Sequence, residues 1–387
     1  GGAHRCLFSD PWNPCEIAVM KDFFHPYVCA LRDLLGIAPP NLHAAMQQVF
    51  INEDVLRAQY AASALANRQD DFVLYRIIGN DLPPRHEVGQ SLRSLDFILQ
   101  HEPALAGCSK KFVVNRILDT ATEGKLIASL ERHGVEFVHL PFDAATYAQI
   151  PLDYACLPGG DQDYLQSRSF RRLPQRHKIR LLTAVNRHRN NYVMHNNGAR
   201  NAALQDGLNL AKWVLPFDGN CFFSAQAWEQ FRTAVVARPW LKYFIVPMAR
   251  IQHNADLLDA SFSPEADEEP QLAFRCDAQE SFNEAFPYGR FPKIEMFWRL
   301  GIPGNWSYTV EKAWDPPRRS LSPEAYQFAL AGWVARMDSG VQHLEQAGHD
   351  MGSKRGDARR TAILNLFVKL DIQYQGHCSF EQYLPSS

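Results

Sequence analysis

The sequence lacks the patterns that identify several function classes directly. Its 387 residues include eight cysteines, but these form no Cys-x-x-Cys pair, and no Cys/His spacing resembles a zinc site. No window approaches about 18 consecutive apolar residues, so we expect no membrane span. The formal net charge is only −2, which provides no basic field of the kind that drives nucleic-acid binding. We therefore expect neither DNA nor RNA as a partner.

The composition that is present is that of a globular protein. Hydrophobic residues make up 46% and charged residues 21% of the chain, which suits one large domain or two ordinary ones. Cys6, Cys15 and Cys29 cluster near the N-terminus, where disulfide bonds would tie down an extension. Asn305-Trp-Ser is a glycosylation sequon. Together these features favour the secretory lumen (Golgi or endoplasmic reticulum), with the cytoplasm as the alternative.

The order of the expected elements predicts the fold class. Residues 72–78, 111–118 and 135–140 are apolar runs typical of strands that are covered on both faces. Helices are expected between them, at about residues 89–99 and 121–133. This alternation is the signature of a parallel α/β half that binds a nucleotide.

We therefore expect an α/β fold with a mostly parallel sheet flanked by helices. A helical N-terminal arm is expected at residues 1–70, a central domain at residues 71–315, and a helical C-terminal extension packed on it at residues 316–387. The other expected elements are a helix at residues 225–236, a strand at residues 243–248, and helices at about residues 322–346 and 358–370.

The most informative stretch of the chain joins a polar helix start to an acidic strand end. Residues 196–201 (Asn-Asn-Gly-Ala-Arg-Asn) can open a helix at Gly198 whose first-turn amides, with Arg200, face a diphosphate. The apolar strand at residues 212–217 then delivers Asp218 to the rim where open α/β sheets present ligand groups. A carboxylate there can bind a hard cation that bridges two phosphates. The alternative is an ordinary helix cap followed by an ordinary strand end.

These residues resemble glycosyltransferases of the GT-A fold, in particular the family 2-like group. In that group a comparable Asn/Gly/Arg helix precedes an apolar strand that ends in an Asp-x-Asp metal motif. Here the motif is represented by Asp218 and Asn220, so Asn stands at the second acidic position. The resemblance covers roughly residues 72–304 and implies a Rossmann-like sheet, a nucleotide-sugar donor and a carbohydrate-type acceptor. It also implies Mn²⁺ or Mg²⁺ on Asp218 and Asn220, with His349, or alternatively His343, completing the metal shell.

The resemblance further implies which side chains hold the donor. In that fold the loop after the first strand contacts the base and ribose, a role that falls to Asn80 or Asp81 here, with Asp119 after the second strand. For Asn80-Asp81 an ordinary Asx turn before two prolines is the alternative. The complete predicted donor-binding set is Arg76, Asn80, Asp81, Asp119, Asn197, Arg200, Asn201, Asp218, Asn220, Arg290 and Lys293.

Inverting transfer needs a base that takes the proton of the acceptor hydroxyl. By resemblance, this base lies in an acidic loop after the metal motif, here residues 265–271. The candidates are Asp267, Glu268 and Glu269, and Glu269 is the first choice because the following Pro270 holds it extended. The alternative is a solvated acidic loop.

Two further segments carry charge near the expected site. Residues 286–301 are dense in aromatic and charged side chains, and Arg290 and Lys293 within them would close over the donor phosphates. Residues 168–189 contain a basic run, which is either a lid over the diphosphate or a solvated surface helix.

The sequence thus predicts an enzyme that moves a sugar from a nucleoside-diphosphate donor to a hydroxyl acceptor on a glycan, glycoprotein or glycolipid, with inversion. Two alternatives belong to other classes. A nucleotidyltransferase or phosphohydrolase would release pyrophosphate or phosphate without transferring sugar. A non-catalytic carbohydrate-binding relative would bind its ligand without turnover.

Overall fold

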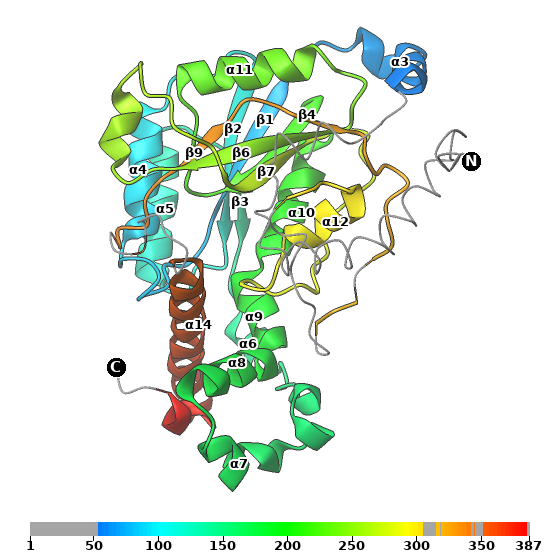
Figure 1. Ribbon diagram of the computed structural model, residues 1–387. Coiled ribbons are helices and arrows are strands. Elements are labelled where there is room, and N and C mark those ends of the chain that lie inside the picture. The colour runs from blue at the N-terminus through cyan, green and yellow to red at the C-terminus, as the bar shows by residue number, and fades with distance from the viewer. Residues whose placement is uncertain (1–52, 305–314, 318, 342–343, 345–350, 385–387) are drawn as a thin grey trace, which may run out of the picture.

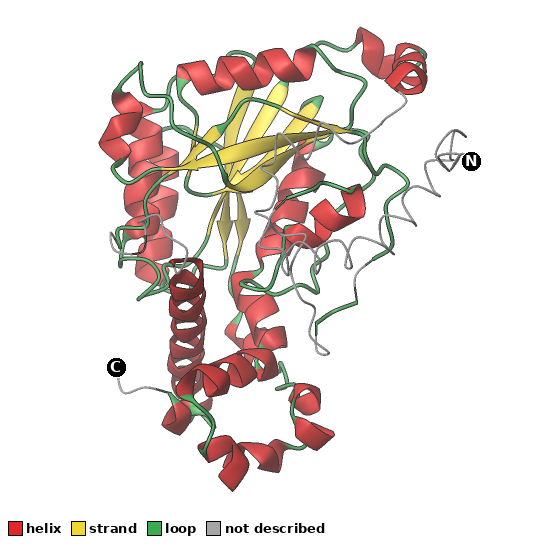
Figure 2. Cartoon of the chain, in the orientation of Figure 1, coloured by secondary structure: helices red, strands yellow, loops and turns green. Residues whose placement is uncertain are grey.

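The computed structural model describes residues 53–304, 315–317, 319–341, 344 and 351–384. Within them, helices surround a single β-sheet (Figure 1), which confirms the α/β class; Figure 2 shows the sheet in yellow and the helices in red. No helix in these ranges is long and apolar enough to cross a membrane. Several predictions lie outside the described residues, namely those on Cys6, Cys15, Cys29, Asn305 and most of the N-terminal arm.

The described sheet runs in the order β3-β2-β1-β4-β7-β6-β9-β5, and β8 pairs with β6 beside this path. Its strands are β1 (Phe72–Ile78), β2 (Cys108–Asn115), β3 (Phe137–Leu140), β4 (Trp213–Asp218), β5 (Cys221–Phe222), β6 (Tyr243–Arg250), β7 (Glu268–Arg275), β8 (Phe328–Leu330) and β9 (Val334–Arg336). Strands β3, β2, β1 and β4 are all parallel. The parallel arrangement of this half, predicted from the apolar runs, is therefore confirmed.

The other half of the sheet corrects the prediction of a mostly parallel sheet, because the sheet is mixed. Strand β7 pairs antiparallel with both β4 and β6, and β5 pairs antiparallel with β9. The fully described connection from β6 to β7 contains one short 3₁₀ helix, η5 (Asn254–Leu258), in place of a crossover helix, and the chain returns antiparallel. Residues 268–271, expected in an acidic loop, are the start of β7.

The helix expected at residues 322–346 is also wrong. Strands β8 and β9 occupy this segment, and both pair parallel with β6. The segment is a short apolar run, and periodicity alone cannot distinguish a buried strand from a buried helix in such a run. Gly332 separates the two strands with a φ of 51°, and a Cβ there would lie 2.6 Å from the backbone nitrogen of Phe231.

The described α-helices are α3 (Glu53–Ala61), α4 (Gln90–His101), α5 (Thr120–Arg132), α6 (Ala144–Ala148), α7 (Arg168–Arg171), α8 (Gln175–Val185), α9 (Arg187–Met194), α10 (Asn196–Gly207), α11 (Ala225–Val236), α12 (Ile294–Leu300) and α14 (Met351–Gln375). Helices α4, α5 and α11 pack on the sheet face that carries Phe72 and Leu74. Helices α10 and α12 pack on the opposite face, which carries Val73 and Tyr75. Because successive strand residues face opposite sides, this two-sided burial explains the continuous apolar run of β1.

A separate group of helices lies beyond the carboxyl ends of the parallel strands (Figure 1). Helices α6, α7, α8, α9 and α14 share their own apolar core, in which Leu182 and Phe367 are fully buried. Asp371 of α14 forms a buried ion pair with Arg189 at 2.7 Å and also accepts a hydrogen bond from Tyr147. The basic run at residues 168–189 is therefore helical and packed on α14, with most of its arginines exposed.

Candidate functional site

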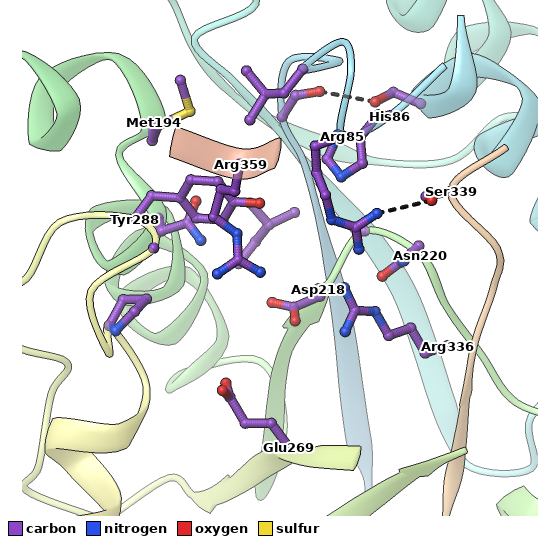
Figure 3. Close-up of a pocket in the computed structure, with 18 of the residues that line it drawn as sticks. Arg85, His86, Met194, Asp218, Asn220, Glu269, Tyr288, Arg336, Ser339 and Arg359 are labelled. Atoms are coloured by element: carbon purple, nitrogen blue, oxygen red, sulfur yellow. Dashed lines mark hydrogen bonds between the residues drawn. The ribbon is translucent and has the colours of Figure 1, made fainter. Parts of the chain in front are cut away.

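The carboxyl ends of β1, β2 and β4 open onto a cavity of about 410 Å³ (Figure 3). The chain runs from β1 outward to β2 and β3 on one side and places β4 on the other. The strand order therefore reverses between the neighbouring strands β1 and β4, and such a topological switch point is where open α/β sheets bind ligands. The cavity brings together many of the predicted residues: Asn80, Asp81, Arg200, Asp218, Asn220, Glu268, Glu269 and Lys293.

Asp218 is the last residue of β4 and lies at the centre of these contacts (Figure 3). The strand can turn away directly after it because the next residue is glycine: a Cβ at Gly219 would lie 2.4 Å from the carbonyl oxygen of Ile77. Asp218 Oδ1 accepts a hydrogen bond from Arg200 Nη2 at 2.6 Å. Its Oδ2 accepts one from Gln271 Nε2 at 2.9 Å. Both carboxylate oxygens are therefore engaged by the protein.

Lys293 supplies the second cation beside Asp218. Its side chain is 4% exposed, and its Nζ lies 3.4 Å from Asp218 Oδ2, 3.2 Å from Glu269 Oε1 and 3.1 Å from the carbonyl oxygen of Pro270. Burial by itself would raise the pKa of Asp218, but the charges of Lys293 and Arg200 outweigh it and hold this pKa well below its usual range. Asp218 is thus ionised at neutral pH.

The two glutamates at the start of β7 have different surroundings. Glu268 forms an ion pair with Arg250 at 2.6 Å and lies 3.7 Å from Arg336. Burial alone would raise its pKa, but the hydrogen bond from Arg250 and the charges of both arginines lower it to about 2. Glu269 is 40% exposed and contacts Lys293; Figure 3 shows its carboxylate directed into the cavity. Asp267, which precedes the strand, does not line the cavity.

Asn80 and Asp81 line the cavity, but their side chains are used within the protein. Asn80 Nδ2 donates to the carbonyl oxygen of Arg116, and its Oδ1 accepts from the backbone nitrogen of Leu118, both at 2.8 Å. Asp81 accepts hydrogen bonds from the backbone nitrogens of Gly89 and Ser91 at the start of α4. These two side chains therefore tie the loop after β1 to the loop after β2 and to the start of α4. Their hydrogen bonds reach residues 8 to 38 positions away, so they are not those of the local Asx turn that the sequence offered as the alternative.

Other predicted donor ligands lie away from the cavity. Arg76 is fully buried, forms an ion pair with Glu102 and donates to the carbonyl oxygen of Cys221 at 2.7 Å. Asp119 caps α5 by accepting from the backbone nitrogen of Thr122. Asn201 donates to the carbonyl oxygen of Phe282, and Arg290 pairs with Asp315. His349 and His343 lie outside the described residues.

The start of α10 lies between the main cavity and a smaller one. Asn197 donates to the carbonyl oxygens of Asn283 and Pro292, each at 2.7 Å, and accepts from Arg200. Gly198 lies under the ring of His195, where a Cβ would approach within 2.0 Å. The first-turn residues of α10 line the smaller cavity of about 270 Å³. Asn197 therefore positions Arg200. Asn196, in the same first turn, also lines the main cavity, whereas Asn197 and Gly198 line the smaller one.

Sequence reasoning missed a group of arginines around the main cavity. They come from the loop after β1, from β6, from β9 and from α14, and they are Arg85, Arg250, Arg336, Arg355 and Arg359. Segments so distant in sequence carry no shared local motif, so only the fold brings them together. Arg359 lies over the ring of Tyr288, 5.1 Å from its centroid, and Figure 3 shows its guanidinium in the cavity.

The cavity lining as a whole is positive. It carries two more lysine and arginine side chains than aspartate and glutamate side chains. Among its buried polar atoms, Arg200 Nε and Asn115 Oδ1 have no hydrogen-bond partner within the described part of the chain. Arg359 Nε, also buried, shares this property among the described residues. Unpartnered buried donors and a positive lining suit an anionic ligand with several acceptor oxygens.

The side chains here do not fit a divalent cation. Mn²⁺ and Mg²⁺ favour several oxygen ligands with carboxylates among them. Among the described residues, no group of three or more His, Cys, Asp or Glu side chains is placed to hold a metal. Asp218 is already engaged by two cations and Gln271, and Asn220 uses its amide nitrogen on the carbonyl oxygen of Met337 at 3.2 Å. The predicted metal site is not assembled from the described side chains.

Comparison of the chain with protein-family models and with curated proteins finds no match. Its function must therefore be inferred from the fold and from the chemistry of this cavity.

Proposed function

We propose that this protein is a glycosyltransferase of GT-A-like fold that moves a sugar from a nucleoside-diphosphate donor to the hydroxyl of a carbohydrate-type acceptor. The observation that carries this proposal is the positive cavity at the β1/β4 switch point, with Asp218 at its centre. Parallel α/β halves bind nucleotides at this position, and the excess of cations matches the charge of a diphosphate.

The ends of the cavity suit the two ends of such a donor. Asn115, at the end of β2, is 1% exposed and offers an unpartnered acceptor, Oδ1, among the described residues. A ring N–H or ribose hydroxyl of a nucleoside can donate to it. Arg200, Arg336 and Arg359 lie along the same cavity and can donate to phosphate oxygens. The nucleoside would thus lie toward β2 and the diphosphate toward β9 and α14.

Glu269 is the proposed base. As the acceptor oxygen bonds to the anomeric carbon, its proton passes to the Glu269 carboxylate. The bond between the anomeric carbon and the diphosphate oxygen breaks, and its electron pair leaves with the diphosphate. The arginines stabilise the charge that develops there. Glu268 is the poorer base, because its pKa of about 2 and its pairing with Arg250 make the carboxylate a weak proton acceptor.

A thermal-shift screen of UDP-, GDP- and CMP-linked sugars tests this proposal. A donor at about a hundredfold over its dissociation constant should stabilise the fold by about 2.7 kcal/mol. A donor that binds is then incubated with oligosaccharide acceptors, and the elongated product is measured by mass spectrometry. If none of these nucleotide sugars raises the thermal midpoint, the proposed donor site is contradicted. Release of phosphate or pyrophosphate without a sugar product would instead identify a phosphohydrolase or nucleotidyltransferase, and binding without turnover a non-catalytic relative.

A further inference from the structure

We propose that Lys293, together with Arg200, takes the place of the divalent cation in this cavity, so that the diphosphate is bound and released by protein cations alone. This inference rests on the proposed function for the identity of the anion. It goes beyond that function by naming the side chains that supply the positive charge opposite the diphosphate.

The position of Lys293 carries the inference. Its ammonium lies between the carboxylates of Asp218 and Glu269, at 3.4 and 3.2 Å, and also contacts the carbonyl oxygen of Pro270 at 3.1 Å. Three oxygen neighbours match the three N–H donors of an ammonium group. Two carboxylates and a carbonyl are also the kinds of ligand that a hard cation takes. The lysine thus occupies the point at which a metal ion would otherwise join the two acidic side chains.

Arg200 completes this arrangement from the other side. Its side chain is 3% exposed, and its Nη2 lies 2.6 Å from the other oxygen of Asp218. A divalent cation approaching Asp218 would meet the charges of Arg200 and Lys293 at short range. It would also have to displace the hydrogen bonds that those cations already make. Both effects disfavour a metal at Asp218.

The same cavity offers other groups for the anion itself. Arg200 Nε is buried and without a partner among the described residues, although its Nη atoms are engaged by Asn197 and Asp218. Arg359 Nε, from α14, is also buried and unpartnered within that part of the chain. These two arginines, on elements far apart in the sequence, line the same cavity and add positive charge that a ligand with several acceptor oxygens can use. A diphosphate supplies such oxygens without a bridging metal.

The first experiment uses the wild-type protein. The dissociation constants of UDP, GDP and inorganic pyrophosphate are measured by calorimetry after chelator treatment, in EDTA and in excess Mn²⁺, with the affinity of each anion for free Mn²⁺ taken into account. We expect the constants in the two conditions to agree within about threefold. A tightening of tenfold or more in Mn²⁺ would overturn the inference.

The second experiment removes the internal cation and measures Mn²⁺ binding by electron paramagnetic resonance, without any nucleotide. Lys293→Ala removes the cation that lies between the carboxylates of Asp218 and Glu269, so this variant should gain a Mn²⁺ site at least tenfold tighter than any in the wild type. Lys293→Arg keeps the positive charge and should gain none. Lys125→Ala, on the exposed face of α5, is the matched control and should behave as the wild type does.

The two failures can be told apart. If no nucleoside diphosphate or donor sugar binds, the proposed function fails, while the Mn²⁺ measurements still decide the role of Lys293. If the wild type binds Mn²⁺ as tightly as Lys293→Ala does, the lysine does not stand in for a metal, whatever the donor is. If Lys293→Ala does not fold, as judged by circular dichroism, the wild-type comparison of EDTA with Mn²⁺ decides alone.

Discussion

Glu269 is the side chain on which the chemistry of the proposed transfer depends most directly. Replacing it with Gln keeps its size and removes the proton acceptor, so the rate of transfer should fall by about 10²–10⁴-fold. Donor affinity should fall far less than the rate, because Lys293 and the arginines proposed to hold the diphosphate are unchanged. The measurement is single-turnover transfer, combined with donor titration by calorimetry.

Glu265→Gln is the matched control for this experiment. It makes the same change of charge at an exposed position a few residues upstream and should leave the rate of transfer unchanged. A Glu269→Gln variant that transfers sugar at the wild-type rate would assign the base to another group.

Glu268 should affect stability, and its effect should depend on pH. Its pKa is lowered from 4.5 to about 2 in the folded protein, so the ion pair with Arg250 stabilises the fold above pH 4.5 and loses this effect as pH falls toward 2. At neutral pH the Glu268→Gln variant should be less stable by about 3 kcal/mol. At pH ~3 the difference should shrink to less than half of that value.

Urea unfolding of the wild type and of Glu268→Gln, followed by tryptophan fluorescence across this pH range, gives the difference in the free energy of unfolding. A difference that stays constant down to acidic pH would show that the charge of Glu268 is not what stabilises the fold.

The elements that the sequence predicted correctly are those with a strong local pattern. The continuous apolar run of β1 and the alternating elements that follow it needed no tertiary information, because burial on both faces of a parallel sheet imposes that pattern directly. The strands between Phe328 and Arg336 lie inside the helix that the sequence predicts at residues 322–346, because short apolar runs fit both structures. Only pairing with β6 decided it, and such pairing is a long-range property.

The joint between α9 and α10 gives an element-scale test. Gly198 lies under the ring of His195, so Gly198→Ala should force this joint apart and destabilise the fold by about 1–3 kcal/mol. Gly124, within α5, has open space around its Cβ position. Gly124→Ala should therefore stabilise the protein by about 0.5–1 kcal/mol through helix propensity. Opposite shifts in thermal midpoint are the expected result; equal shifts would mean that the contact with His195 does not constrain the joint.

Across the whole molecule, the site is built from pieces that the sequence could not connect. Asp218 was predicted because an apolar strand and a polar helix flank it closely in the chain. The arginines at positions 336 and 359 were not, because β9 and α14 reach the cavity only through the packing of the C-terminal segment. The sequence also could not predict that Arg76 and Asn201 make buried structural contacts, because the tertiary fold brings them to their partners Glu102 and Phe282.

This dependence on packing predicts that the helical group supports the cavity from a distance. Asp371 of α14 is 3% exposed and pairs with Arg189 of α9. Asp371→Asn leaves that arginine buried without its counterion, which should cost about 3–5 kcal/mol. Because α14 also carries Arg355 and Arg359 into the cavity, loosening it should weaken pyrophosphate binding as well. The measurements are the free energy of unfolding and, under conditions where the variant is still folded, calorimetry with pyrophosphate.

Asp357→Asn separates this effect from a general loss of charge on the same helix. Asp357 is 38% exposed and pairs with Arg360 at the surface, and such pairs contribute about 0–1 kcal/mol. Its replacement should leave stability nearly unchanged. If Asp371→Asn lowers stability but binds pyrophosphate as tightly as the wild type, α14 serves the fold alone and its arginines take no part in holding the anion. Alternatively, stability and pyrophosphate binding both fall in Asp371→Asn, while Asp357→Asn keeps both. Then α14 contributes to anion binding, because its arginines reach the anion only while the buried ion pair holds the helix in place.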